Sequence, residues 1–269
     1  MPAILVGVGA AGERYRRAVK VGAVWRYPVK SMRGEQLREA AVGPRGLAGD
    51  RHYGVLDVAS GTILSAKREG RLLQAQSVLA GSELTVRLPT GETLLGLGAN
   101  VDRALSDWLG RPVHLVEAAE HGRATYENIY DFEDDASEPT SWEGPPGSFV
   151  DSSPVHLLTT SSLGVGASGR PDLQWDVRRF RPNIVVDSAE DEMVELAWSG
   201  RRVRIGEVLL DIWKGCARCV MTTRSQPGGI ERQLDVLRHI NAEHAALLGV
   251  LAGVSEGGRL AVGQGVSLA

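Results

Sequence analysis

Short apolar runs separated by glycine and proline dominate the first 95 residues of the chain. Their lengths and punctuation predict five strands, over residues 22–27, 36–42, 53–57, 74–79 and 84–88. The pattern changes after residue 100. Val101, Leu105, Leu109 and their apolar neighbours recur at the spacing of an α-helix. This segment predicts an amphipathic helix that Asn100 caps and Gly110 terminates.

Polar and acidic residues interrupt the apolar pattern between residues 117 and 149. The run DFEDDASEPTSWEGPPG has too few apolar positions to bury much surface, which is typical of a long loop. Many short strands with few helices indicate a mainly β fold with some α, a β-barrel-like architecture decorated by helices. Beyond the loop we expect strands over residues 155–158, 183–186, 202–205 and 208–213, a helix within 233–248, and a closing strand pair within 259–268.

These changes of pattern divide the chain into an extension, a first β-rich module, an acidic loop and a second β-rich module. Within the extension, Gly7, Gly9 and Gly12 have the spacing of a dinucleotide-binding loop. That motif requires a preceding strand and an acidic residue at the end of a second strand, and neither is evident. The glycines therefore do not predict nucleotide binding. The four stretches cover residues 1–20, 21–117, 118–149 and 150–269.

Composition excludes several classes of protein. A chain of 269 residues with 43% hydrophobic and 23% charged residues is typical of a soluble globular protein. Its net charge of -3 provides no general attraction for nucleic acid or anionic lipid, so we expect neither as a partner. No apolar run reaches the roughly 18–20 residues that a bilayer span needs. With two cysteines and no evident secretory leader, the chain is expected to be cytoplasmic.

The two cysteines, Cys216 and Cys219, form a C-x-x-C motif within KGCARCVMTT. A zinc site would need a second ligand pair, and a thioredoxin-like redox pair would open a helix, whereas the residues after Cys219 favour a strand. A third interpretation is one reactive thiolate, because Lys214, Arg218 and Arg224 are close in sequence and positive charge lowers a thiol pKa. Two buried apolar side chains are the structural alternative, which suits Cys216 better than Cys219. A soft thiolate suits a soft metal centre.

Cationic and hydroxyl side chains gather in four other blocks, YPVKSMRGE, LAGDRHYG, RRFRPNIVV and TTSSLG. Each block alone has an ordinary explanation, since strand ends are often solvated and hydroxyl runs often cap helices. Together they offer the ammonium, guanidinium and hydroxyl groups that bind phosphate. The residues concerned are Lys30, Ser31, Arg51, residues 159–162, Arg178, Arg179, Arg181 and Asn183.

Two pairs of blocks resemble the MOSC-domain family, the homologues of the C-terminal region of molybdenum-cofactor sulfurase. YPVKSMRGE with GLAGDRHYGVLD is similar to the family's N-terminal β-barrel module. RFRPNIVV with CARCVMTTRSQPGG is similar to the MOSC domain itself. The resemblance extends over residues 21–268, and the C-x-R-C-x-x-T-T block is its most specific part. Within the family, the chain resembles in particular the mitochondrial amidoxime-reducing components and their bacterial counterparts.

The resemblance implies a binding site for the molybdenum cofactor, molybdopterin. It implies that Cys219 is the metal ligand and that Asp151 is a catalytic residue near the open position of the metal. Where relatives have TTVDP this chain has TTRSQP, which removes an acidic residue and adds Arg224. The implied cofactor contacts are Lys30, Ser31, Arg51, Thr160, Arg181, Asn183, Arg218 and Thr222.

The same resemblance implies a molybdenum-dependent oxidoreductase that reduces N-hydroxylated small molecules, such as amidoximes, hydroxylamines and N-hydroxylated bases. Two cysteines leave none for an iron–sulfur cluster, so electrons would come from an external ferredoxin- or cytochrome-like protein. The acidic loop is expected to gate the site, to dock that protein, or to be a solvated insertion. Two other functions stay open: a cofactor carrier or insertion protein, and a sulfur-transfer protein that holds a persulfide on Cys219.

Overall fold

The computed structural model describes residues 19–129 and 131–269 of the chain. Gly7, Gly9 and Gly12, with nearly all of the predicted extension, lie outside the described residues. In the described part strands predominate and helices are few and short. The predicted mainly β fold with some α is therefore confirmed. No helix in that part is long and apolar enough to cross a membrane.

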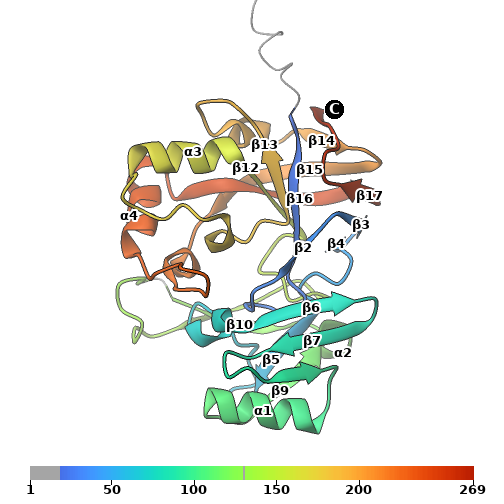
Figure 1. The fold of residues 1–269 in the computed structure, drawn as a ribbon, viewed down its shortest axis with the longest axis vertical. Helices are drawn as coiled ribbons and strands as arrows, with labels where there is room; N and C mark the ends of the chain where they lie inside the picture. The colour runs from blue at the N-terminus through green and yellow to red at the C-terminus, as the bar shows by residue number, and fades with distance from the viewer. Residues whose placement is uncertain (1–18, 130) are drawn as a thin grey trace, which may run out of the picture.

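An eight-stranded sheet forms the larger half of the fold and fills the upper part of Figure 1. Its strand order is β18-β14-β15-β16-β12-β13-β1-β2. Neighbouring strands are antiparallel except β12 and β13, which run parallel because helix α3 carries the chain back between them. The bounds are β1 Lys20–Arg26, β2 Glu35–Leu37, β12 Val155–Thr159, α3 Thr160–Gly169, β13 Ile184–Asp187, β14 Arg202–Ile205, β15 Val208–Ala217, β16 Leu247–Glu256 and β18 Val266–Leu268.

A smaller sheet, β17-β3-β4, shares one apolar core with the large sheet. Val21 on β1, Leu210 on β15 and Leu260 on β17 are fully buried in this core. Burying each such side chain stabilises the fold by roughly 1.5–3 kcal/mol. The three strands are β3 Glu39–Gly43, β4 Gly46–Leu47 and β17 Gly258–Ala261.

The end of the chain does not form the predicted strand pair. β17 pairs with β3 and β18 pairs with β14, so each strand completes a different sheet edge. That prediction was wrong because an open edge elsewhere satisfies the backbone groups of each strand. As β1 also pairs with β13, both sheets combine strands from the first and second predicted modules.

The lower part of Figure 1 is a second body with its own apolar core. Helix α1 packs Val101, Leu105 and Leu109 into that core, as the apolar period predicts. Gly110 ends the helix in the left-handed conformation, but the N-cap is Gly98 rather than Asn100, whose side chain instead accepts a hydrogen bond from Arg103. The elements of this body are β5 Tyr53–Asp57, the 3-10 helix η2 Gly70–Gln74, β6 Gln76–Ala80, β7 Glu83–Arg87, β8 Thr93–Leu95, α1 Ala99–Leu109 and β9 Val113–Glu117.

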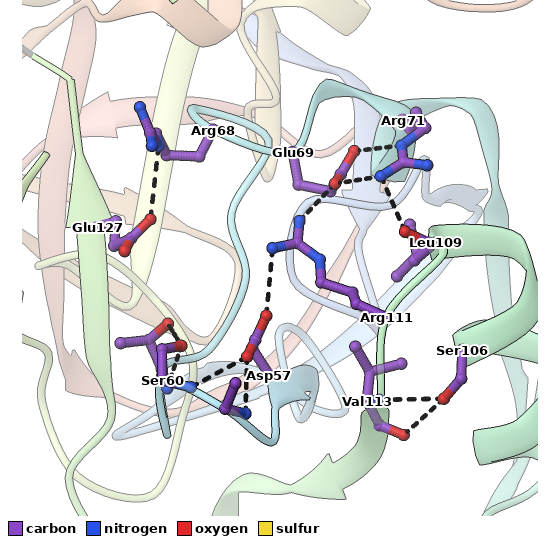
Figure 2. A network of polar contacts seen from close by, with 12 residues as sticks. Asp57, Ser60, Arg68, Glu69, Arg71, Ser106, Leu109, Arg111, Val113 and Glu127 are labelled. Atoms are coloured by element: carbon purple, nitrogen blue, oxygen red, sulfur yellow. Dashed lines mark hydrogen bonds and ion pairs between the residues drawn. The ribbon is translucent and has the colours of Figure 1, made fainter. Parts of the chain in front are cut away.

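A buried carboxylate holds this second body together (Figure 2). Glu69 accepts two hydrogen bonds of 2.7 Å from Arg71 and one of 2.5 Å from Arg111. Arg111 also pairs with Asp57 at 3.2 Å, and Arg71 donates to the carbonyl of Leu109. Burial opposes ionisation of Glu69, yet the two guanidinium groups keep its pKa below the usual value. The network therefore joins η2 to β5, to the end of α1 and to the turn between α1 and β9.

The predicted acidic loop is ordered at both of its ends. β10 and β11 pair antiparallel, and Tyr126 on β10 is buried with Ala124 and Phe149 in a small apolar cluster. The central run, residues 131–147, is mostly exposed, as its few apolar positions predict, whereas Tyr126 and Phe149 on either side of it are buried. These flanking apolar residues are too widely spaced to show a period, and only distant contacts gather them. The elements here are α2 Ala118–His121, β10 Thr125–Asn128 and β11 Thr140–Glu143.

Arg179 fixes the segment that follows the two cysteines. It ends the 3-10 helix η3 (Val177–Arg179), and its side chain is fully buried. Its guanidinium donates to the carbonyl oxygens of Thr222 at 3.2 Å and Glu231 at 2.7 Å, among others. A buried guanidinium is tolerated only when its donors are satisfied. The path of residues 219–233, including the 3-10 helix η5 (Val220–Thr223), therefore depends on this side chain.

Replacing Arg179 with lysine should destabilise the protein strongly. An ammonium cannot serve acceptors spread around a planar fork, so several carbonyls lose their donors. We expect Arg179→Lys to lower the free energy of unfolding by about 3 kcal/mol, as measured by urea denaturation. Arg178→Lys is the matched control, because Arg178 is partly exposed in an ion pair with Asp176 and should contribute about 1 kcal/mol or less. Equal urea midpoints for Arg179→Lys and wild type would contradict this role.

Candidate functional site

Two buried lysines converge on one carboxylate between the two bodies. Lys30 Nζ lies 2.5 Å from Asp151 Oδ1, and Lys67 Nζ lies 3.3 Å from Asp151 Oδ2. The lysines are 5% and 3% exposed, whereas the Asp151 side chain is 36% exposed. Lys30 also donates to the carbonyl oxygen of Phe149 at 2.8 Å. The carboxylate is thus the accessible member of a charged triad.

The charges of this triad set its protonation. Burial opposes ionisation of Asp151, but Lys30 and Lys67 hold its pKa well below the usual range. Burial lowers the pKa of Lys30 to about 8, against the opposing attraction of Asp151. Asp151 is therefore ionised at neutral pH and can accept a proton but has none to donate. With this lowered pKa, Lys30 can release a proton close to neutral pH.

Two aromatic rings from the β10–β11 pair cover the lysines. Lys30 Nζ lies 3.9 Å from the ring centroid of Tyr126, and Lys67 Nζ lies 4.6 Å from that of Trp142. The electron-rich face of an aromatic ring attracts a cation, most strongly where water is excluded. Lys67 and both aromatic residues escaped the sequence-based prediction, because each lies in a segment whose pattern resembles an ordinary turn or loop.

A second cationic group surrounds the ring of Tyr27. The guanidinium carbons of Arg51 and Arg181 lie 4.7 Å and 4.2 Å from its centroid. Arg51 pairs with Asp50 at 2.5 Å and donates to Asn183 Oδ1 at 3.2 Å. Arg181 donates through Nη1 to the carbonyl oxygen of Met32, while its buried Nη2 has no hydrogen-bond partner among the described residues. This cluster therefore contains a buried donor that is free to bind a ligand.

Three of the predicted cofactor contacts adopt a left-handed backbone conformation. The φ angles of Ser31, Arg51 and Arg181 are 66°, 46° and 52°, and only two other non-glycine residues in the described part have positive φ. This conformation is uncommon for residues with a side chain and persists where the surroundings impose it. Ser31 Oγ, for example, accepts the backbone N–H of Ala66 at 2.9 Å. The backbone thus holds these three residues in fixed orientations.

The two cysteines occupy different environments, and both are free thiols. Cys216 is buried at the end of β15, where burial raises the pKa of its thiol although Arg218 donates to the sulfur at 3.0 Å. Cys219 is half-buried and precedes η5, so the strand expected after it was a wrong prediction. Thr222 donates to the carbonyl oxygen of Cys219 at 3.0 Å. Cys219 is therefore the more accessible thiol.

His156 and Arg218 connect Cys216 to the arginine cluster. Its Nε2 lies 3.4 Å from Arg218 Nη1, and its backbone N–H donates to Asn183 Oδ1 at 3.2 Å. Burial, followed by the charges of Arg218 and Arg51, lowers the pKa of His156 well below the usual value. The imidazole is therefore neutral at physiological pH. This residue was missed because it lies within the apolar run of β12, where the sequence indicates core.

Other predicted residues lie outside this arrangement. Thr160 begins α3, at the opposite end of β12 from His156, and its hydroxyl donates to the carbonyl oxygen of Ser188. Arg178 pairs with Asp176 rather than facing the cluster, and Arg179 is structural. Of the three cations expected around the cysteines, Lys214 is exposed on β15 and Arg224 pairs with Asp135, which leaves Arg218 as the one in contact with a thiol.

Protein side chains alone do not form a metal site in the part of the chain that the structure describes. No group of three or more His, Cys, Asp or Glu residues there can hold an ion. Two surface pockets of about 500 and 290 Å³ also lie elsewhere, since none of the predicted site residues lines them. What the arrangement offers is one accessible thiol beside a buried cationic cluster with an unsatisfied donor. That set suits a ligand that is anionic at one end and carries a soft metal at the other.

The fold and this site define a MOSC-domain protein. Residues 145–267 match the MOSC domain, and residues 18–136 match the MOSC N-terminal beta barrel domain. Together the two matches span most of the chain, so it belongs to the MOSC-domain family. The family resemblance predicted from the sequence blocks is confirmed.

Several known proteins are similar to this chain. It is 27% identical to mitochondrial amidoxime-reducing component 1 of Danio rerio, over 84% of this chain and 77% of that protein. It is also 27% identical to molybdenum cofactor sulfurase of Oryza sativa subsp. japonica, over 76% of this chain but 28% of that protein. Among solved structures, the YUAD protein from Bacillus subtilis matches with a TM-score of 0.47 and 12% identity, covering 93% of this chain and 95% of that one. The name of the sulfurase associates the family with the molybdenum cofactor.

Removing the carboxylate of Asp151 should destabilise the protein in a pH-dependent way. Asp151→Asn leaves two buried ammonium groups without their anion, and we expect the free energy of unfolding at pH 7 to fall by about 1–3 kcal/mol. Because the folded-state pKa of Asp151 is depressed, its stabilisation is present above the ordinary value of 3.8 and is lost as the pH falls below it. The difference between variant and wild type should therefore shrink in acid.

Urea denaturation across this pH range provides the measurement. Asp172→Asn is the matched control, because Asp172 lies in an exposed ion pair with Arg170 and its loss should change little. A wild type and an Asp151→Asn variant of equal stability at pH 7 would show that the lysines do not depend on this carboxylate.

Proposed function

We propose that this protein binds the molybdenum cofactor and reduces N-hydroxylated small molecules, such as amidoximes, hydroxylamines and N-hydroxylated bases. The observation that carries the proposal is the buried Arg181 Nη2, which has no partner among the described residues. It lies in the cluster that connects through His156 and Arg218 to Cys216, three residues before the accessible Cys219. A buried donor without an acceptor costs free energy that a bound anion would recover. The names of the amidoxime-reducing relatives support the choice of substrate class.

The residues present fit such a cofactor. Arg181 and Arg51 provide guanidinium forks for the phosphate, and the left-handed turn at Ser31 fixes the backbone beside them. Cys219 provides the soft sulfur ligand that molybdenum would take. Asn183 acts indirectly, because its amide is already bonded to Arg51, His156 and the carbonyl of Trp25. Arg218 and Thr222 hold the cysteine segment in place from either side of Cys219.

When bound, the cofactor supplies the two-electron chemistry that removes an oxygen atom from the substrate. Asp151 then acts as a proton relay rather than as the source of the proton. Lys30 Nζ holds a proton 2.5 Å from Asp151 Oδ1, and the partly exposed carboxylate can pass it to a leaving oxygen. Electrons come from an external ferredoxin- or cytochrome-like protein, because the chain's two cysteines cannot hold a cluster.

Molybdenum and pterin content test the proposal directly. Protein from a cofactor-competent host should contain both in near-stoichiometric amounts, by elemental analysis and by pterin fluorescence after oxidation. Cys219→Ser should lose metal or reductase activity towards a benzamidoxime, because its thiolate is replaced by a weak hydroxyl ligand. Cys216→Ser is the matched control and should retain both, since Cys216 is buried against Arg218.

Replacing the unsatisfied guanidinium should weaken cofactor retention. Arg181→Gln removes the positive charge and the free donor, so pterin content should fall about tenfold or more, the loss expected for one charge-assisted hydrogen bond. An unchanged pterin content in Arg181→Gln would show that the cofactor phosphate does not bind at Arg181. Pterin without turnover in wild type would favour a cofactor carrier, and the absence of both pterin and metal would favour a sulfur-transfer protein with a Cys219 persulfide.

A further inference from the structure

The centre of the acidic segment, here called the strap (residues 131–139), lies between β10 and β11 and has no regular structure. Although most of its residues are exposed, it is tied by ion pairs to arginines of the segment after η5 and of helix α4 (Leu234–Glu243). Asp135 pairs with Arg224 at 2.6 Å and with Arg232 at 3.1 Å, and Glu133 pairs with Arg238 at 2.8 Å. The strap therefore reaches from the β10–β11 pair to the segment that follows Cys219.

Arg224 is the central anchor of the strap. Its side chain is only 9% exposed, and besides Asp135 it donates through Nη2 to the carbonyl oxygen of Lys67 at 2.6 Å. The pKa of Asp135 is lowered by the surrounding cations, and the hydrogen bond from Arg224 is the main cause. One guanidinium thus joins the strap, the Lys67 segment and the end of η5. Because its guanidinium is buried, this pair contributes more than the pairs around it in which both side chains are exposed.

The two strands that carry the strap also cover the lysine triad. Tyr126 on β10 lies over Lys30, and Trp142 on β11 lies over Lys67. If the strap moved away from Arg224, β10 and β11 would move with it, because the strap connects these two strands. The rings that cover the lysines and the carboxylate that anchors the strap therefore belong to one arm, here defined as residues 125–128 and 131–143.

We propose that this arm is a latched cover over the Lys30–Asp151–Lys67 triad, held closed by the Arg224–Asp135 ion pair and opened when that pair separates. Opening would expose both lysines and the faces of Tyr126 and Trp142 to solvent or to an incoming ligand. Because the outer pairs of Arg232 and Arg238 are about half exposed, salt screens them and favours the open state. The proposal concerns access to the triad and does not depend on which ligand binds there.

The lysine content of the chain provides a selective test. The sequence has four lysines, of which Lys30 and Lys67 are buried in the triad, while Lys20 and Lys214 are exposed. Reductive methylation followed by peptide mass spectrometry therefore reports opening at the first pair and has an internal reference at the second. In Asp135→Asn, methylation of Lys30 and Lys67 should accelerate about tenfold, the factor that corresponds to losing one charge-assisted hydrogen bond. The rates at Lys20 and Lys214 should not change.

Glu138→Gln is the matched control, because it removes one negative charge from the same strap and no ion pair of Glu138 is found within the described residues. Amide hydrogen exchange should show the same contrast, with faster exchange in β10 and β11 of Asp135→Asn and unchanged exchange in the β15–β16 pair. Wild type in about 1 M sodium chloride should shift in the same direction, since the screening length is then about 3 Å.

Three results would overturn the proposal. Equal methylation rates in Asp135→Asn and wild type would show that the pair does not hold the arm. If Glu138→Gln accelerated methylation of Lys30 and Lys67 equally, the effect would come from the lost negative charge and not from the Arg224–Asp135 pair. Faster exchange throughout β15 and β16 would mean that the lysines react through global unfolding. All three readouts are independent of molybdenum content and of turnover, so failure of the proposed function would leave them unaffected.

Discussion

The buried guanidinium of Arg179 is the interaction on which the site depends. A guanidinium keeps its charge at physiological pH, so its burial is possible only where oxygen acceptors surround its five N–H groups. Here most of the acceptors belong to the segment after Cys219 or pack against it, among them the carbonyls of Thr222, Arg224 and Glu231. That segment has little regular structure of its own beyond η5. Its course, and with it the location of Cys219, is set by one side chain from a different part of the sequence.

The same requirement, that buried charge must find a partner, organises the space between the two bodies. Asp151 neutralises Lys30 and Lys67, Asp50 neutralises Arg51, and aromatic faces accept the remaining positive charge. Arg181 and Arg218 are the exceptions, because Arg181 Nη2 and Arg218 Nε are buried without a partner among the described residues. Buried cationic donors without acceptors suit an anionic ligand, and the accessible thiol of Cys219 suits a soft metal.

Much of this arrangement was predictable, since charged and hydroxyl residues in short blocks at strand ends indicated Lys30, Ser31, Arg51 and Arg181. The sequence blocks could not show which of several neighbouring arginines faces the site. Arg178, Arg179 and Arg181 lie within four positions of each other, yet one is in a surface ion pair, one is structural and one faces the cluster. The turn of η3 and the left-handed backbone conformation of Arg181 decide where each of these side chains points. Neither feature can be predicted from the types of the residues involved.

By itself, the sequence determined the mainly β class, the family, most strand positions and the residues that contribute charge and thiol, because these follow from residue type and short-range period. Tertiary structure decided what depends on distant contacts. It turned residues 247–256 into a strand beside β15, although Leu247 had extended a helical period. It brought Lys67 and His156 to the site and tied the acidic strap to Arg224. Burial of a charge is compensated by whichever partner the fold supplies, and that partner is often more than a hundred residues away or in the other body.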